Sequence, residues 1–361
     1  MNATPMLDNK RRLYRSLCEL ANASPSNLPS RLKAVYHGGA AWRGSHPLNE
    51  IDGLDAIEAT IWQPLLRSFP DLERRDLIFC GGSYHDRDYV AALGHYCGTF
   101  REDFLTVPAT GRPIYLRYGE VHQVEDGKIV QSTCLWDFLD LIRQAGFWPI
   151  APSLGTEGMW PGPITSDGIV LHTTNAATSA ASIRQTLDMH KTLADYEDNE
   201  GLGRDGLLLM PQVEHWHPKM MWYGPSGIGT TRGLQGFVDY HQLPFRIAFP
   251  NRKGGEQITD LAKGGHYIQI GDGHYSVTGG WPSVRAMHVG PDFLGAGPTG
   301  REVTMRVMDF YLHHEGLIRE NWVPIDIIEL LLQMGVDVFS RMRSHFNQGV
   351  LPRPQNDNGV G

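Results

Sequence analysis

Residues 103–112 read Asp-Phe-Leu-Thr-Val-Pro-Ala-Thr-Gly-Arg, and residues 292–301 read Asp-Phe-Leu-Gly-Ala-Gly-Pro-Thr-Gly-Arg. The two stretches share their first and last triplets at a constant offset of 189 residues. A block nearer the start of the chain repeats at an offset of 180, so that Trp42, Gly44, Gly53, Leu54, Pro64, Phe69 and Pro70 recur as Trp222, Gly224, Gly233, Leu234, Pro244, Phe249 and Pro250. Chance would not keep two registers over so many Trp, Gly and Pro residues. The chain is therefore one domain repeated in tandem, with a nine-residue insertion in the second copy.

Length and composition agree with two folded domains. The chain has 361 residues, of which 41% are hydrophobic and 20% charged. Its net charge of −8, without a basic stripe, argues against nucleic acid as the main partner. No apolar run approaches the roughly 20 residues that span a bilayer, so we expect no membrane partner and a cytoplasmic location. The four Cys residues form no Cys-x-x-Cys pair, which argues against a zinc knuckle or a disulfide framework.

Hydrophobic periodicity predicts the same order of elements in each copy, with helices first and an antiparallel sheet after them. In the first copy we expect helices at 9–23 and 53–68, strands near 74–82, 88–99, 113–124 and 128–136, and a helix at 137–145. In the second we expect helices at 181–196 and 233–248, strands near 259–270, 274–288, 302–313 and 317–325, and a helix at 326–334. This order predicts an α+β class. The expected domains are 9–148 and 181–345, joined by a Pro/Gly-rich linker at 149–180 and followed by a disordered tail at 346–361.

Several motifs in this order resemble one known family. Both copies contain Phe-Pro after the second helix, Phe-Leu-x4-Thr-Gly-Arg, a Gly turn before the last strand, and an Asp that starts the last helix. In this order and spacing the chain resembles the SnoaL-like polyketide or ester cyclases of the nuclear transport factor two-like superfamily. The resemblance covers roughly 9–148 and 181–345.

The resemblance implies a fold, a chemistry and a contact between the copies. The fold would be two cone-shaped domains, each a curved antiparallel sheet wrapped by helices around a pocket. The chemistry would be a cyclase, aldol or isomerase step in which a pocket Asp is the acid/base group, without metal or organic cofactor. By position that Asp is Asp326 in the second copy and Asp137 in the first. We also expect the two sheets to pack together as an intramolecular pseudo-dimer, with a further homodimer left open.

Asp326 has two interpretations from the residues alone. It shares one face of its strand with Glu320, Trp322 and Pro324, because strand faces alternate. If that face lines the cavity, desolvation raises the carboxyl pKa toward that of a useful general base. The alternative is that Asp326 only caps the helix that follows it.

Two further groups are candidates for stabilising negative charge. Arg232 ends a Gly-rich loop at 222–233, whose backbone N–H groups could hold a carboxylate or enolate oxygen. A tight structural turn is the alternative. His241 lies four residues before Phe245 on the next helix, and it is either a second acid/base group or a structural histidine.

Aromatic side chains predict the walls of the pocket. For substrate binding we select Trp222, Tyr223, Phe245, Trp281 and Trp322, although core packing is the commoner role of such residues. A second site in the first copy would use Asp137, Trp42 and His95.

No metal is expected, because only His215 and His217 could chelate and no further ligand has compatible spacing. The partner of the protein would be a small carbonyl or polyketide-like molecule. Two alternatives remain open, namely a module that binds a small molecule without transforming it, and a hydrolase that acts on an epoxide or an ester.

Overall fold

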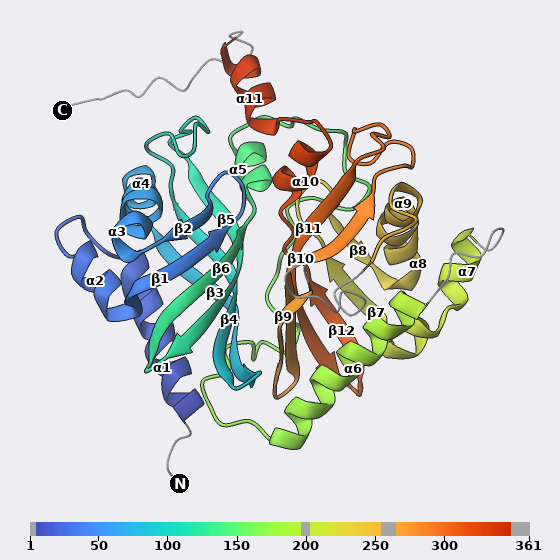
Figure 1. Ribbon diagram of the computed structural model, residues 1–361, viewed down its shortest axis with the longest axis horizontal. Coiled ribbons are helices and arrows are strands. Elements are labelled where there is room, and N and C mark those ends of the chain that lie inside the picture. The colour runs from blue at the N-terminus through green and yellow to red at the C-terminus, as the bar shows by residue number, and fades with distance from the viewer. Residues whose placement is uncertain (1–4, 196–202, 254–264, 348–361) are drawn as a thin grey trace.

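The computed structural model describes residues 5–195, 203–253 and 265–347, and each copy of the repeat contributes one sheet with its own helices (Figure 1). The first copy contains α1 (Pro5–Ala21), α2 (Leu28–Val35), β1 (Tyr36–Gly44), β2 (Asn49–Asp52), α3 (Leu54–Ile57), a π-helical turn (Glu58–Trp62), α4 (Gln63–Ser68), β3 (Glu73–Tyr84), β4 (Arg87–Thr99), β5 (Pro113–Glu125), β6 (Lys128–Trp136) and α5 (Phe138–Gln144). α1 is amphipathic, since Leu13, Leu17 and Leu20 are buried at helical spacing.

The second copy repeats this order. It contains α6 (Ala176–Asp195), α7 (Gly203–Leu209), a 3-10 turn (Pro211–His215), β7 (Trp216–Tyr223), β8 (Thr230–Arg232), α8 (Gly233–Phe237), a π-helical turn (Val238–Gln242), α9 (Leu243–Ala248), β9 (His266–Asp272), β10 (Tyr275–Met287), β11 (Glu302–His314), β12 (Leu317–Trp322) and α10 (Ile327–Gln333). α11 (Val338–Asn347) follows it. The π-helical turn at the same place in both copies is a further mark of their common origin.

Each sheet has six strands in the same order, β2-β1-β6-β5-β4-β3 in the first copy and β8-β7-β12-β11-β10-β9 in the second. The predicted α+β class with two tandem domains is confirmed, but the sheets are mixed rather than purely antiparallel. β1 pairs with β6 in parallel, and β7 pairs with β12 in parallel. Neither β1 nor β7 was among the expected strands, so these two parallel pairs were not predicted.

The Gly turns before the last strands were predicted correctly. Asp126 and Gly127, like Glu315 and Gly316, have positive φ angles, as a two-residue hairpin turn requires. The expected strand near 259–270 is described only from residue 265 onward, because 254–264 lie outside the described residues. The same holds for residues 348–361 of the expected disordered tail.

The two sheets pack against each other in the centre of the molecule, and most of the helices cover their outer faces (Figure 1). A hydrophobic cluster joins the sheets, with Leu93 and Val121 from one side and Val277 and Phe310 from the other. A buried ion pair between Lys10 of α1 and Asp272 of β9, 2.6 Å long, adds a polar contact between the copies. Each sheet is therefore buried on both faces, by helices on one and by the other sheet on the second.

The segment between the copies follows the surface of both. Gly168 accepts a hydrogen bond from Phe79 N–H of β3, and Val170 N–H donates to the Phe79 carbonyl. Thr156 exchanges two backbone hydrogen bonds with Thr230 of β8. The expected linker thus has no helix or strand of its own before α6, yet backbone hydrogen bonds attach it to both sheets.

Candidate functional site

Asp326 lies at the contact between the two copies. It is the N-cap of α10, where Oδ1 accepts from Glu329 N–H (3.2 Å). Its Oδ2 accepts from the backbone N–H of His46 (2.9 Å) and from Arg306 Nη1 (3.1 Å). Burial raises the pKa of Asp326 to about 6, against the opposing effects of Arg306 and the two N–H groups. The carboxylate therefore both caps the helix, which was the alternative left open, and holds a loop of the first copy.

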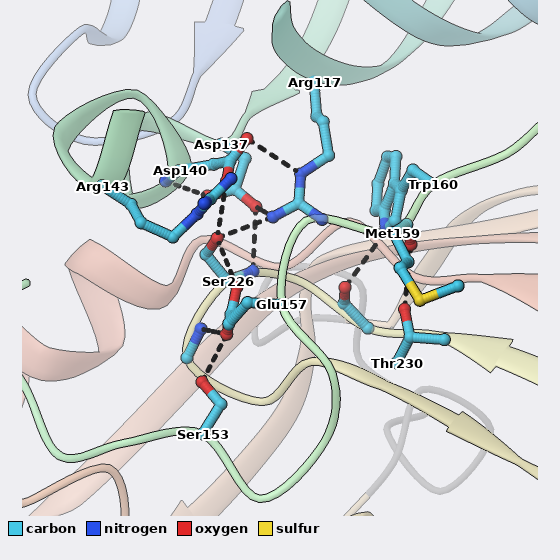
Figure 2. Close-up of polar contacts among 12 residues, drawn as sticks. Arg117, Asp137, Asp140, Arg143, Ser153, Glu157, Met159, Trp160, Ser226 and Thr230 are labelled. Carbon is cyan, nitrogen blue, oxygen red and sulfur yellow. Dashed lines mark hydrogen bonds and ion pairs between the residues drawn. The ribbon is translucent and has the colours of Figure 1, made fainter. Parts of the chain in front are cut away.

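Asp137 makes the reciprocal contact with a loop of the second copy (Figure 2). It caps α5 through Asp140 N–H (2.9 Å), and its Oδ2 accepts from Ser226 N–H (2.9 Å) and Arg117 Nη2 (2.8 Å). Under the offsets of the repeat, Asp137 corresponds to Asp326, Arg117 to Arg306, and His46 to Ser226. Each copy thus uses its Asp–Arg pair to bind the other copy's loop.

The backbone N–H groups of the Gly-rich loop at 222–233 donate hydrogen bonds to other parts of the protein. Ser226 N–H binds Asp137, Gly227 N–H binds Glu157 (2.8 Å), and Thr230 N–H binds the Thr156 carbonyl (2.8 Å). Arg232 lies exposed at the end of β8, with Nη1 3.8 Å from Met221 Sδ. The loop has the contacts of a structural turn, which was the alternative to an anion cradle.

Three of the predicted aromatic residues face the other sheet rather than the interior of their own domain. Trp322 stacks on Tyr223, with ring centroids 5.1 Å apart, and its Nε1 donates to the Pro161 carbonyl (3.0 Å). Trp281 lies under the Arg306 guanidinium, 4.3 Å from the ring centroid. All three belong to the cluster between the sheets. The alternation of strand faces was right, but the face shared by Trp322 and Asp326 is the intersheet face.

The other two predicted aromatic residues, Trp222 and Phe245, lie in the interior of the second domain, between its sheet and its helices. His241 stacks on Trp222 with ring centroids 3.9 Å apart, and it also stacks on Phe245 with ring centroids 5.7 Å apart. Burial and the nearby Arg246 guanidinium lower the pKa of His241 to about 3, so the ring is neutral at pH 7. Its Nδ1 is buried and makes no hydrogen bond.

An acid that the sequence did not single out faces the same interior. Asp309 of β11 shares its strand face with Val307 and Tyr311, which both pack in the interior core. Burial raises its pKa, against smaller effects of His190, Asn321 and Tyr311. Asp309 nevertheless keeps part of its surface accessible, and it forms no ion pair within 4.0 Å among the described residues. A desolvated acid with accessible surface is suited to proton transfer.

Neighbouring polar groups connect Asp309 to the aromatic wall. Asn321 Nδ2 lies 3.5 Å from Asp309 Oδ1, and Asn321 stands opposite Trp222 in the strand register. The Tyr311 hydroxyl lies 2.7 Å from Nε2 of His190 on α6. The interior thus combines a carboxyl group, hydrogen-bonding side chains and aromatic surface.

A cavity of about 150 Å³ adjoins this interior at His241. Its walls come from α9 and the preceding turn, the 292–295 loop and the linker, and they include Tyr240, Pro244, Phe293, Ala151 and Leu154. Ligand pockets in proteins are typically concave and mostly apolar with a few polar groups, which is the character of this cavity.

The first domain has a filled interior instead. Glu120, at the position of Asp309, accepts from Arg74 Nη1 (2.6 Å) and Trp136 Nε1 (2.9 Å). Burial opposes ionisation, but Arg74 and His122 hold the pKa of Glu120 at about 2. Arg74, Glu120 and Trp136 all have at most 5% of their surface exposed. The acid is ionised, paired and inaccessible.

The remaining residues of the expected second site are dispersed. Trp42 is buried in this same interior, edge-on to Trp136 at 5.6 Å. His95 lies on β4 near Arg117, where burial and that guanidinium lower its pKa to about 4. Trp42 therefore lines the sealed interior, whereas Asp137 and His95 lie by the intercopy contact.

Within the described ranges, no group of three or more His, Cys, Asp or Glu side chains could hold a metal ion. His217 Nε2 lies 3.3 Å from Glu315 Oε2 on the surface. No helix of the described chain is long and apolar enough to cross a membrane.

Residues 18–145 match the family model described as SnoaL-like polyketide cyclase, which confirms the resemblance for the first copy. No curated protein matches the chain significantly. Solved structures match one domain's length of it. A candidate SnoaL-like polyketide cyclase from Jannaschia sp. CCS1 is 17% identical, covers 39% of this chain and 94% of its own, and has a TM-score of 0.33.

Two further structures are similar to the same extent. IdmH from Streptomyces antibioticus, a candidate polyketide cyclase, is 21% identical over 38% of this chain and 99% of its own, with a TM-score of 0.31. An NTF2-like protein of unknown function from Burkholderia pseudomallei is 14% identical over 40% and 100%, with a TM-score of 0.30.

Proposed function

We propose that the second domain is an acid–base enzyme without a cofactor, and that it acts on a small carbonyl or polyketide-like substrate in its interior. The observation that carries the proposal is Asp309, a deeply placed carboxyl group with a raised pKa that retains accessible surface. The match of the first copy to the SnoaL-like cyclases supports the same reaction class. In the first domain the equivalent acid, Glu120, is paired with Arg74 and is inaccessible. We therefore assign the first domain a supporting role and not a catalytic one.

In this mechanism Asp309 removes a proton from the carbon beside a substrate carbonyl. The developing enolate oxygen would accept a hydrogen bond from a neutral side chain, and His241, whose Nδ1 makes no hydrogen bond, would supply it. Trp222, which is 2% exposed, would hold the His241 ring by stacking, and the partly exposed Phe245 would contact the flat part of the substrate. The protonated Asp309 would then return the proton to the product.

Asp309 replaces Asp326 as our proposed acid/base group, on the basis of contacts. Asp326 already accepts three hydrogen bonds and belongs to the contact between the copies. A base engaged in this way could leave its partners only by opening that contact. Asp309 has the weaker set of partners and faces the aromatic interior.

The experiment measures proton removal from a simple model compound. It therefore does not require the physiological substrate. Ring-bearing β-keto esters such as ethyl benzoylacetate would be incubated in D2O, and loss of the proton signal beside the carbonyl would be followed by NMR. Ethyl 2-methylbenzoylacetate would provide a slower-exchanging probe. We expect the wild type to accelerate exchange, and Asp309→Asn to lose roughly 10²–10⁴-fold of the acceleration.

Asp326→Asn is the matched variant, since it makes the same chemical change at another carboxyl group whose pKa is raised by burial. It should retain exchange in the fraction that stays folded, as judged by circular dichroism. Loss of exchange in Asp326→Asn with retention in Asp309→Asn would return the role to Asp326. Binding of the ester without any acceleration would favour the non-catalytic binding module.

A further inference from the structure

A second cavity, of about 210 Å³, lies between the two sheets, and we call it the intersheet pocket. Both copies contribute walls. Arg43, Arg87 and Gln131 come from the first sheet, and Tyr267 and Trp281 come from the second. Neither Asp309 nor His241 is among its lining residues, so it is separate from the site proposed above.

The charge of the intersheet pocket is opposite to that of the protein. Its described lining side chains include two arginines and no acid, whereas the whole chain has a net charge of −8. Arg87 is exposed and forms no ion pair with a described residue. Arg43 has only a 4.0 Å contact with the exposed Glu50. Both guanidinium groups are therefore available to an anion, which they can bind through paired N–H groups.

The lining also contains aromatic rings and one buried hydroxyl group. Trp281 has Arg306 over its ring, and Tyr84 and Tyr89 add further ring surface. The Tyr267 hydroxyl is buried, and its interaction with the Thr133 side chain, which also lines the pocket, falls short of a well-formed hydrogen bond. Burial raises the pKa of Tyr267, so this hydroxyl stays a donor. A ligand acceptor would satisfy it.

We propose that the intersheet pocket binds a small aromatic anion, a single ring that carries a carboxylate or an equally acidic enol. The arginines would hold the anionic group, the Tyr267 hydroxyl would donate to a ring substituent, and Trp281 would contact the ring. The size fits, because a protein cavity of about 150 Å³ is enough for benzene. Since its walls come from both copies, the ligand would also bridge the two domains.

The test uses sodium benzoate as the probe and benzamide as its neutral isostere, with binding to the full chain measured by titration calorimetry. We expect benzoate to bind the wild type, and benzamide to bind at least tenfold more weakly. The double variant Arg43→Gln/Arg87→Gln should weaken benzoate binding by roughly tenfold or more. Arg184→Gln removes an exposed arginine of α6 outside the pocket, and it should leave binding unchanged.

A further variant separates lost charge from lost structure. Gln131→Trp narrows the pocket without removing a charge, and it should also weaken benzoate binding. Asp309→Asn should leave this binding intact, so failure of the proposed enzyme activity would not affect the result. Absence of benzoate binding at about 10 mM, equal binding by the double variant, or loss of binding in Asp309→Asn would each overturn the proposal.

Discussion

Arg117 is the cation whose removal should damage the contact between the copies most. Its side chain is 3% exposed and lies 2.8 Å from Asp137 and 3.4 Å from Asp140. It also donates to Ser226 Oγ (2.6 Å), and its guanidinium lies 5.0 Å from the Trp160 ring centroid. Arg117→Met leaves the buried Asp137 carboxylate without its cation, and it leaves Asp140 with the partly exposed Arg143 alone (Figure 2). Removal of one partner from a buried ion pair costs about 3–5 kcal/mol, and we expect a loss of unfolding free energy in this range.

The equivalent change in the second copy should cost less. Arg306 is 18% exposed, and it serves one carboxylate, Asp326, together with the Asn49 side chain. After Arg306→Met, Asp326 still accepts from two backbone N–H groups. We expect a loss of about 1–3 kcal/mol, the cost of one weakened buried polar group. Two residues that occupy the same place in the repeat should thus differ by about 2 kcal/mol.

The assay is urea unfolding at pH 7, followed by tryptophan fluorescence and by circular dichroism so that separate unfolding of the two domains would be seen. Arg143→Met is the control, because Arg143 is 35% exposed and pairs with Asp140 alone. It should cost less than about 1 kcal/mol. The reasoning is refuted if Arg306→Met costs as much as Arg117→Met, or if Arg117→Met costs no more than the control.

Three further measurements test the interior and the linker. The folded pKa of Glu120 is about 2, below its ordinary 4.5, so the stability it contributes is present above pH 4.5 and is lost as pH falls toward 2. Glu120→Gln should remove about 3 kcal/mol of that pH dependence, as measured by urea titrations at several pH values, and an unchanged slope would contradict this. Because the pKa of Asp309 is raised, the pH profile of deuterium exchange should rise with a midpoint above the ordinary carboxyl value of about 4; a lower midpoint counts against Asp309 as the base. Gly168→Ala places a Cβ against the Leu77 carbonyl, so it should cost about 1–3 kcal/mol and speed proteolysis of 149–175, whereas cleavage at the wild-type rate would show that the linker is not held there.

The repeat in the sequence was sufficient to predict two sheets of equal order. Conserved spacing between Trp42 and Pro70, and again between Trp222 and Pro250, fixed which segments are equivalent. The Asp126-Gly127 dipeptide correctly predicted the turn between two neighbouring strands. Strand β1 was missed, because its start at Tyr36–Gly39 is rich in small residues and lacks a clear alternation of apolar and polar side chains.

The inner face of each sheet could not be identified from alternation. Period two correctly grouped Glu320 with Trp322, but both faces of the sheet are buried and neither has the polar pattern of an exposed face. Glu320 accepts hydrogen bonds on the intersheet side, from the Tyr223 hydroxyl and from Ile164 N–H. The signal that would have identified Asp309 is its alignment with Glu120, since both are acids in the middle of a strand at the same repeat position.

The contact between the copies also bears on the entrance to the proposed site. Ala151 and Leu154 of the linker and Gly227 of the Gly-rich loop all line the cavity beside His241. Gly227 is fixed by Glu157, and its neighbour Ser226 is fixed by Asp137 of the first copy. One wall of the cavity therefore depends on residues outside the second domain. The first copy, whose own acid Glu120 is inaccessible, would therefore still be needed for the shape of the proposed site in the second.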